Sequence, residues 1–313
     1  MNTSVKVLFI GGTGIISSAC SRLALERGID LHLLCRGRSI RPIPEGARVL
    51  SADIDDAAAV QEALGSLEFD AVVDWIAFRP SQIERDLELF RGRTSQYVFI
   101  SSASAYQKPP QKLPITEETP LENPFWEYSR NKIACEEALL AAYGADGFPV
   151  TIVRPSHTYD RTLLPFRGGY TLIDRIRRGK PLLVHGDGTS LWTLTHHRDF
   201  ARAFTGLLGE ARAIGEAYHI TSDEWLTWNE IARLLGAAAG VEAQLAHVPS
   251  QTVARFDRDW GDSLLGDKSH CSIFDNSKIR TIVPGFAAEI PFAEGAREIV
   301  NWYDATPAAQ QVN

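Results

Sequence analysis

Apolar and polar residues follow two different patterns along the first half of this chain. Short, nearly continuous runs of Val, Ile, Leu and Phe predict strands that are buried on both faces. Between them lie longer stretches with amphipathic spacing, which predict helices. The predicted strands cover residues 5–10, 31–34, 49–54, 71–76, 97–101 and 150–153. Strands and helices that alternate in this way indicate an α/β fold with a doubly wound parallel sheet.

The first predicted strand runs directly into a glycine-rich turn, VKVLFIGGTGIISS over residues 5–18. A strand, a glycine turn and a helix N-terminus suit a dinucleotide pyrophosphate, because glycine lets the backbone approach the phosphates and the helix end offers free N–H groups. Ser17 stands where a third glycine is usual, and it is small enough for close packing of helix and strand. An ordinary tight turn is the alternative. The sheet is therefore predicted to be of the Rossmann type, with these cofactor-binding residues in the turn: Gly11, Thr13, Gly14, Ile15 and Ile16.

The ends of the later strands carry further cofactor candidates. After the second strand the chain has Arg36 and Arg38 and no carboxylate. An acid at this place binds the ribose 2′-hydroxyl of NAD, whereas arginines suit a 2′-phosphate, so NADP is favoured over NAD; solvated loop charges are the alternative. Asp53 is expected to accept a hydrogen bond from the adenine, to cap the next helix, or both. Ile54 and Ala77 complete the expected set, because ligands of such sheets bind beyond the carboxyl ends of the strands.

A second group of polar residues predicts the chemistry. Tyr128 and Lys132 are four residues apart in a stretch with helical spacing, so both side chains project from one face. A neighbouring ammonium group lowers the pKa of a phenol, which then serves as general acid or base near neutral pH. Ser102 follows the fifth strand, where its hydroxyl is placed to hold a substrate oxygen beside Tyr128. The predicted catalytic residues are thus Ser102, Tyr128 and Lys132, and a surface Tyr–Lys pair without function is the alternative.

Together these motifs resemble the extended short-chain dehydrogenase/reductase family, in its NAD(P)-dependent epimerase/dehydratase branch. The resemblance covers nearly the whole chain, through GGTGIIS, ADI, ISSASAY, PITEETPL, YSRNK, VRPSHTYD, GDGTSLWTLTHHRDFA and EGAREIVNWY. It implies that Tyr128 is the general acid/base, and that Ser102 hydrogen-bonds the reacting carbonyl or hydroxyl. It also implies that Lys132 binds the nicotinamide ribose and depresses the pKa of Tyr128. The implied reaction is hydride transfer between the nicotinamide and a secondary alcohol carbon, and the implied assembly is a homodimer.

From about residue 160 the sheet pattern weakens, and glycine, proline and aromatic residues become frequent. We expect residues 1–160 to form an NAD(P)-binding domain and residues 161–313 to be mainly a smaller substrate-binding domain. A segment near 196–213 is expected to return to the first domain. Two scaffold helices are predicted in the second half, over 228–239 and 294–303.

On the substrate side the chain departs from the nucleotide-sugar enzymes of this branch. Those enzymes usually have Asn where this chain has His157, and Arg where it has Trp192. Trp cannot replace the charge with which Arg holds a phosphate, so the resemblance supports the chemistry better than a nucleotide-sugar substrate. The residues that are candidates to restore phosphate binding are Arg161, Arg167, Arg175 and Arg177. The candidate substrate residues are Ser104, Trp126, His157 and Trp192; for the two tryptophans, stacking on a substrate ring and a scaffold role stay equally open, and for His196 and His197 a scaffold role is favoured.

Composition narrows the function classes further. The 313 residues carry a net charge of −7, which argues against a general affinity for nucleic acid or an anionic membrane. The four cysteines fit no metal spacing, so no metal is expected, and without a signal peptide or transmembrane pattern the expected location is cytoplasmic. The expected function is that of an NAD(P)-dependent oxidoreductase or epimerase of the epimerase/dehydratase type, and the expected partner is a small sugar-like or other substrate. Two further functions stay open: a ketoreductase on a non-nucleotide substrate, and a non-catalytic NAD(P)-binding regulator or RNA-associated protein.

Overall fold

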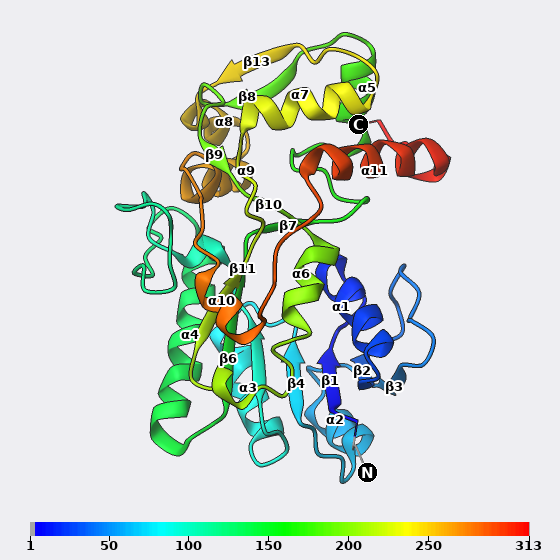
Figure 1. Ribbon diagram of the computed structural model, residues 1–313, viewed down its shortest axis with the longest axis vertical. Helices are drawn as coiled ribbons and strands as arrows, with labels where there is room; N and C mark the ends of the chain where they lie inside the picture. The colour runs from blue at the N-terminus through cyan, green and yellow to red at the C-terminus, as the bar shows by residue number, and fades with distance from the viewer. Residues whose placement is uncertain (1–3, 313) are drawn as a thin grey trace.

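A sheet of seven parallel strands forms the centre of the protein, in the order β3-β2-β1-β4-β5-β6-β11 (Figure 1). The structure is a computed structural model that describes residues 4–312. The strands are β1 (Lys6–Ile10), β2 (Asp30–Cys35), β3 (Arg48–Ser51), β4 (Ala71–Asp74), β5 (Tyr97–Ile100), β6 (Val150–Pro155) and β11 (Ala217–Ile220). The order reverses between β1 and β4, as in a doubly wound sheet. The predicted α/β fold of the Rossmann type is therefore confirmed.

The strands differ from the predictions in several of their bounds and in their number. The third and fourth strands end early, at Ser51 and Asp74, because the chain turns out of the sheet at these points. At the second of them the Asp74 carboxylate accepts a hydrogen bond from the backbone N–H of Ala77 at 2.8 Å, which closes the turn. The seventh strand, β11, was not predicted, and it pairs in parallel with β6 at the edge of the sheet.

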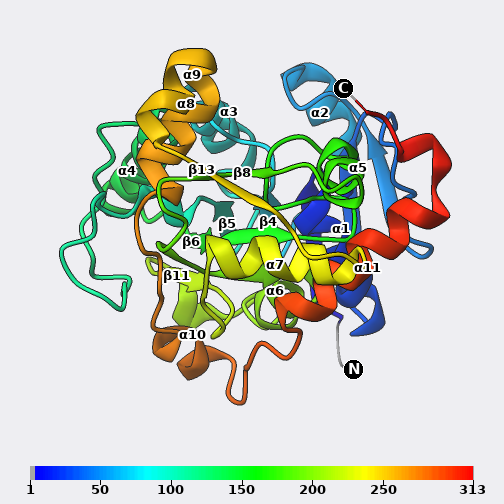
Figure 2. The same ribbon diagram turned by 90° about the horizontal axis from the view of Figure 1, so that it is seen from above.

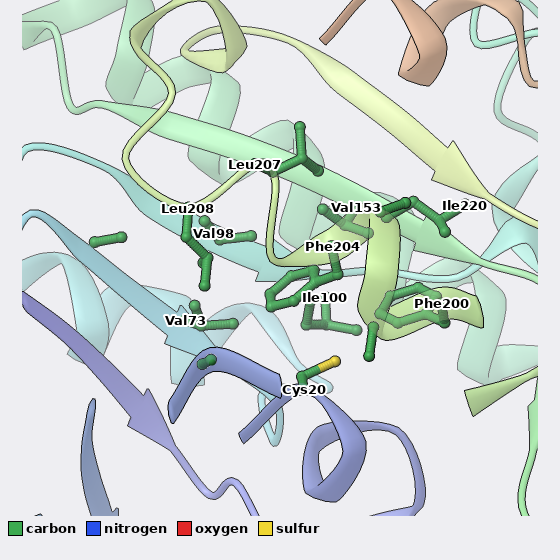
Figure 3. Close-up of a cluster of buried hydrophobic side chains, with 14 of the residues drawn as sticks. Cys20, Val73, Val98, Ile100, Val153, Phe200, Phe204, Leu207, Leu208 and Ile220 are labelled. Atoms are coloured by element: carbon green, nitrogen blue, oxygen red, sulfur yellow. The ribbon is translucent and has the colours of Figure 1, made fainter. Parts of the chain in front are cut away.

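Helices cover both faces of the sheet because the strand residues alternate between two apolar clusters. Val7 and Phe9 face one cluster, and Leu8 and Ile10 face the other. The first cluster packs against α1 (Ile15–Glu26), α6 (His197–Phe204) and α10 (Ser277–Ile282). The second packs against α2 (Ala57–Leu64), α3 (Pro80–Phe90) and α4 (Glu127–Asp146). Figure 3 shows the first cluster, with the rings of Phe200 and Phe204 among side chains of the central strands.

A smaller group of elements lies beyond the carboxyl ends of the strands, seen from above in Figure 2. Its main elements are α5 (Tyr170–Arg177), β8 (Leu182–His185), α7 (Trp228–Ala238), β13 (Leu245–Val248) and α11 (Phe292–Ala305). Shorter ones are β7 (His157–Tyr159), β9 (Leu191–Trp192), β10 (Leu194–His196), β12 (Leu226–Thr227), α8 (Ser250–Phe256), α9 (Arg258–Ser263), the π-helical turn η3 (Leu264–Lys268) and the 3-10 turn η4 (Pro307–Ala309). Two other 3-10 turns lie next to the sheet: η1 (Ala103–Ala105) follows β5, and η2 (Ala211–Ala213) lies near the start of β6. A third apolar cluster, with buried members only between Tyr159 and Tyr303, holds this group together. The division into two domains stays a prediction.

The two scaffold helices of the second half are present as predicted, as α7 and α11. Helix α7 begins with a capping box, in which the Thr227 hydroxyl accepts from the N–H of Glu230 at 3.1 Å and the Glu230 carboxylate accepts from the N–H of Thr227 at 2.8 Å. Satisfying both N–H groups fixes the start of the helix. Helix α11 begins at Phe292, slightly earlier than predicted.

Candidate active site

The glycine turn between β1 and α1 has a backbone that only glycine adopts without strain. Gly11 and Gly12 have φ angles of +100° and +99°, and a Cβ atom on Gly12 would lie 2.6 Å from a methyl carbon of Leu33. Helix α1 begins directly after Gly14, and the Ser17 hydroxyl accepts a hydrogen bond from the Gly14 N–H at 2.8 Å. A bare backbone turn beside a helix N-terminus is the cradle that a dinucleotide pyrophosphate requires.

The predicted cofactor residues that follow β2 and β3 lie near one another at the carboxyl ends of these strands. The Arg36 guanidinium, after β2, is exposed and lies 3.5 Å from the Asp53 carboxylate, after β3. Arg38 is exposed, and Ile54 is buried beside the same edge. Asp53 does not cap α2, because that role belongs to Asp56, whose carboxylate accepts from the helix at 3.1 Å. Asp53 is left as a candidate for the adenine.

Lys132 points away from solvent, toward the carboxyl ends of β4 and β5. Its amine donates hydrogen bonds to the carbonyl oxygens of Ala77 and Ile100, both at 2.7 Å, and lies 4.4 Å from the centre of the Phe78 ring. Burial lowers the pKa of Lys132 to about 8, against the opposing effect of the Asp74 carboxylate. The amine is thus held against the ends of these two strands, and its predicted contact with the nicotinamide ribose stays a prediction.

The pKa of Tyr128 differs from the sequence prediction. Burial raises this pKa to about 12, and a hydrogen bond with the Ser102 side chain lowers it only in part. The predicted depression by Lys132 is therefore wrong for this structure. The reason is geometric: the amine is turned to two backbone carbonyls and lies 5.9 Å from the centre of the Tyr128 ring. The spacing of four residues brings the side chains to one face but does not aim the amine at the phenol.

A cavity of about 380 Å³ opens at Tyr128, and we call it the central cavity. It collects Ile16 from the glycine turn with every predicted substrate residue and two predicted catalytic ones, which are Ser102, Ser104, Trp126, Tyr128, His157 and Trp192. Sequence reasoning missed the contribution of a distant segment, Asp267, Lys268, Ser272 and Phe274. That segment is short and polar and carries no motif, so only the fold could bring it to the site.

Serine hydroxyls line the wall of the central cavity next to Tyr128. The hydroxyls of Ser102 and Ser104 lie 2.9 Å apart, and Ser129 donates to Ser104 at 2.8 Å. His157 is neutral at physiological pH, because burial lowers its pKa to about 3. These neutral groups suit hydroxyl and carbonyl oxygens of a substrate.

The two histidines of the sequence HHRD contact the scaffold. The ring of His197 lies 3.2 Å from the carbonyl oxygen of Ile15, at the start of α1, and His196 lies 3.1 Å from the Glu298 carboxylate. His197 thereby ties α6 to the helix that follows the glycine turn. Both contacts agree with the scaffold role that was favoured for these residues.

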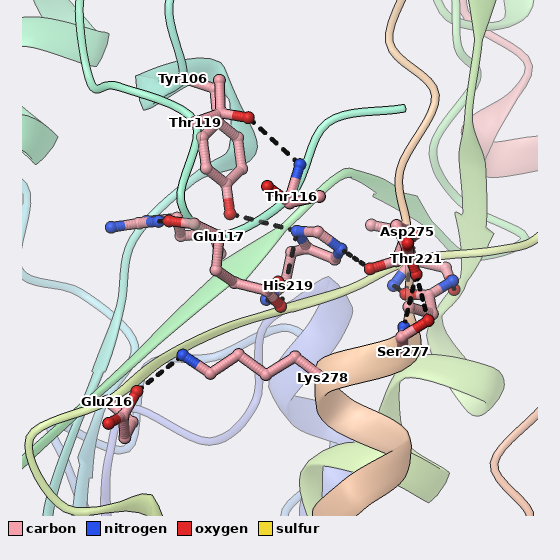
Figure 4. A network of polar contacts seen from close by, with 12 residues as sticks. Tyr106, Thr116, Glu117, Thr119, Glu216, His219, Thr221, Asp275, Ser277 and Lys278 are labelled. Atoms are coloured by element: carbon pink, nitrogen blue, oxygen red, sulfur yellow. Dashed lines mark hydrogen bonds and ion pairs between the residues drawn. The ribbon is translucent and has the colours of Figure 1, made fainter. Parts of the chain in front are cut away.

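A buried polar network fixes the segment that carries the serines (Figure 4). The Tyr106 hydroxyl lies 3.1 Å from Nδ1 of His219, whose Nε2 donates to the carbonyl oxygen of Asp275 at 2.8 Å. Since Nε2 carries the proton, Nδ1 accepts from Tyr106. The Arg154 guanidinium lies 4.9 Å from the centre of the Tyr106 ring and pairs with the buried Glu136 at 2.6 Å. The network joins β6 and β11 to the turn after β5, so the edge strand supports the site.

Two further observations concern the described residues, 4–312. They contain no group of three or more His, Cys, Asp or Glu side chains arranged to hold a metal ion. None of their helices has the length and apolar character needed to cross a membrane.

The parallel sheet and its glycine turn define a doubly wound α/β protein of the Rossmann type. Comparison with known families identifies it further. The sequence model of the NAD dependent epimerase/dehydratase family matches residues 7–221, and the chain belongs to this family. The family resemblance stated from the motifs is therefore confirmed.

Two relatives and one solved structure illustrate the range of similar proteins. The chain is 28% identical over 262 residues to the chloroplast stem-loop binding protein of 41 kDa b of Arabidopsis thaliana, covering 77% of this chain and 65% of the relative. It is 25% identical over 293 residues to 2′-dehydrokanamycin reductase of Streptomyces kanamyceticus, covering 90% and 80%. In structure it is similar to UDP-glucose 4-epimerase from Bifidobacterium longum in complex with NAD+ and UDP, with a TM-score of 0.76, 21% identity, and 97% and 99% of the chains covered.

Proposed function

We propose that this protein is an NAD(P)-dependent oxidoreductase acting on a secondary alcohol or ketone carbon of a small, sugar-like substrate. One observation carries the proposal: the central cavity joins Tyr128 and Ser102 to the start of α1 at Ile16. A substrate in this cavity lies between a proton donor and the expected cofactor site. Membership of a family named for epimerases and dehydratases, and similarity to a reductase, agree with this chemistry.

The residues present fit a nicotinamide dinucleotide. The backbone of Gly11 and the first turn of α1 would hold the pyrophosphate, and Lys132 and Tyr128 would contact the nicotinamide ribose. When bound, the nicotinamide supplies or accepts the hydride. The exposed Arg36 and Arg38, without a carboxylate at the end of β2, support NADP over NAD.

Tyr128 moves the proton in this proposal. With a pKa of about 12 its phenol is protonated at neutral pH, so it donates to the oxygen of a ketone as hydride arrives at the carbon. In the reverse direction it takes the proton of the alcohol. Ser102 holds the same oxygen, and the wall of serine and neutral histidine side chains orients the substrate.

The test is an assay of the purified full chain with NADPH or NADH and a panel of keto sugars. A reductase consumes reduced nicotinamide in proportion to the ketone, which its absorbance reports. An epimerase retains its cofactor and interconverts two alcohols without net consumption of reduced nicotinamide. Such a result would identify the reaction as epimerisation and not net reduction. Failure to bind either dinucleotide in an equilibrium titration would overturn the proposal.

A second candidate function comes from the stem-loop binding relative. The net charge of −7 argues against it, since nucleic-acid binding depends on positive charge. Salt-dependent binding of an RNA hairpin, together with an inactive Tyr128 site, would favour this function instead. The homodimer and the cytoplasmic location stay predictions.

A further inference from the structure

Lys268 is the cation that the central cavity presents to a substrate. Among the described residues that line this cavity it has the only side chain with a positive charge. None of the four arginines considered from the sequence lines it. The polar partners of three of them lie elsewhere: Arg167 pairs with Asp257 and Asp259, Arg177 pairs with Asp304, and Arg175 donates to the carbonyl of Pro181.

The Lys268 amine lies between two indole rings. Its Nζ atom is 5.5 Å from the centre of the Trp126 ring and 5.8 Å from that of Trp192. Asp267, its neighbour in the chain, pairs with the Lys108 amine at 3.3 Å, and within residues 4–312 the Lys268 amine has no ion-pair partner of its own. The Asp267 carboxylate also raises the pKa of Lys268, but it makes its ion pair with Lys108, so the Lys268 amine is left available to a ligand.

The backbone around Lys268 is held in place by side chains from several elements. Its carbonyl oxygen accepts hydrogen bonds from His185 at 3.0 Å and from the Trp228 indole at 3.2 Å. Two residues earlier, the carbonyl oxygen of Gly266 accepts from the Asn123 amide at 2.6 Å, and the same amide group donates to the Ser104 carbonyl at 2.9 Å. The η3 turn is thus fixed to the serine wall, which sets the point from which the Lys268 side chain reaches the cavity.

We propose that Lys268 binds a single anionic oxygen group of the substrate, a carboxylate or a phosphate monoester, while the Trp126 and Trp192 rings pack against the part of the substrate next to it. The inference rests on the proposed function, because it assigns the substrate class to that same cavity. An ammonium group is a compact point charge and suits one such group, whereas a diphosphate is usually held by the fork of an arginine.

The protonation state of Lys268 responds to a ligand at this place. Burial lowers the pKa of Lys268, and a bound anion would favour its charged form again.

The test measures equilibrium binding of matched charged and neutral probes to the full chain. D-Glucuronate is compared with D-glucuronamide, which has nearly the same shape without the charge, and D-glucose 6-phosphate with D-glucose. Tryptophan fluorescence is a suitable readout because two indole rings flank the amine, and calorimetry checks it. The variants are Lys268→Met and, in case methionine disturbs the cavity, Lys268→Gln, with the exposed Lys180→Met as the control.

We expect at least one acid to bind about tenfold more tightly than its neutral counterpart, with the preference lost in both Lys268 variants and kept in Lys180→Met. The acid that is preferred identifies carboxylate or phosphate as the group. Absence of binding by both acids, or a preference that survives both variants, overturns the inference. The assay does not need turnover: a charge preference kept in a protein without oxidoreductase activity would refute the proposed function and leave the Lys268 site standing.

Discussion

Replacing Lys132 by methionine removes a buried amine whose pKa burial lowers from 10.5 to about 8. Between these values the unfolded chain binds a proton that the folded protein does not. The free energy of unfolding therefore rises with pH through this window. The buried ammonium group destabilises the folded protein most below pH 8, where the amine is charged. From about pH 7 to about pH 9.5 the rise contributed by Lys132 is about 2 kcal/mol at most. It is an upper limit because the carbonyls of Ala77 and Ile100 favour the charged amine.

Urea unfolding at the two pH values measures this effect in wild type and in Lys132→Met. Other groups that titrate in the same range contribute equally to both proteins, so the difference between their pH dependences isolates Lys132. Lys180→Met, which removes an exposed amine, is expected to behave as wild type. If Lys132→Met gains as much stability with pH as wild type does, the buried amine is not the cause and the reasoning is refuted.

Three further substitutions test other parts of the account. Gly12→Ala should weaken dinucleotide binding at least tenfold and cost about 1–3 kcal/mol of stability. Gly28 also has a positive φ, but no atom lies within 4 Å of a Cβ added there, so Gly28→Ala should leave dinucleotide binding intact. Equal losses of binding in the two variants, measured by titration, would contradict this. Arg36→Ser should lower NADP affinity about tenfold and leave NAD affinity unchanged, and parallel losses would exclude a 2′-phosphate contact. Glu136→Gln should cost about 3 kcal/mol in urea unfolding because its arginine partner stays buried, while Asp304→Asn at an exposed pair should cost less than about 1 kcal/mol.

The sequence was most informative where the chain must satisfy a backbone requirement. The φ angles near +100° at Gly11 and Gly12 can be adopted without strain only by glycine. The turn, and the sheet that leads into it, could therefore be predicted from the sequence alone. The residues at the strand ends could be predicted next, because a parallel sheet brings the carboxyl ends of its strands to one edge. Ser102 was predicted by this logic and Tyr128 by its helical spacing from Lys132, and the structure brings both to the central cavity.

The parts that could not be predicted depend on tertiary contacts. Strand β11 is short, and its buried His219 is accommodated only because Tyr106 and the Asp275 carbonyl satisfy both ring nitrogens. Lys268 reaches the cavity from a π-helical turn that hydrogen bonds fix in place. The pKa of Tyr128 is set by burial and by where the Lys132 amine points, and residue spacing fixes neither.

The most direct test of the central claim compares Tyr128→Phe with Tyr143→Phe, a substitution of an exposed tyrosine on the same helix. With a substrate identified by NADPH consumption, kcat should fall about 10²–10⁴-fold in Tyr128→Phe, which corresponds to about 3–5 kcal/mol of transition-state stabilisation. Dinucleotide affinity should fall far less than kcat, because Tyr128 supplies only one of the two proposed ribose contacts, and Tyr143→Phe should turn over as wild type does. Full turnover by Tyr128→Phe would contradict the account, because the proton would then come from another group.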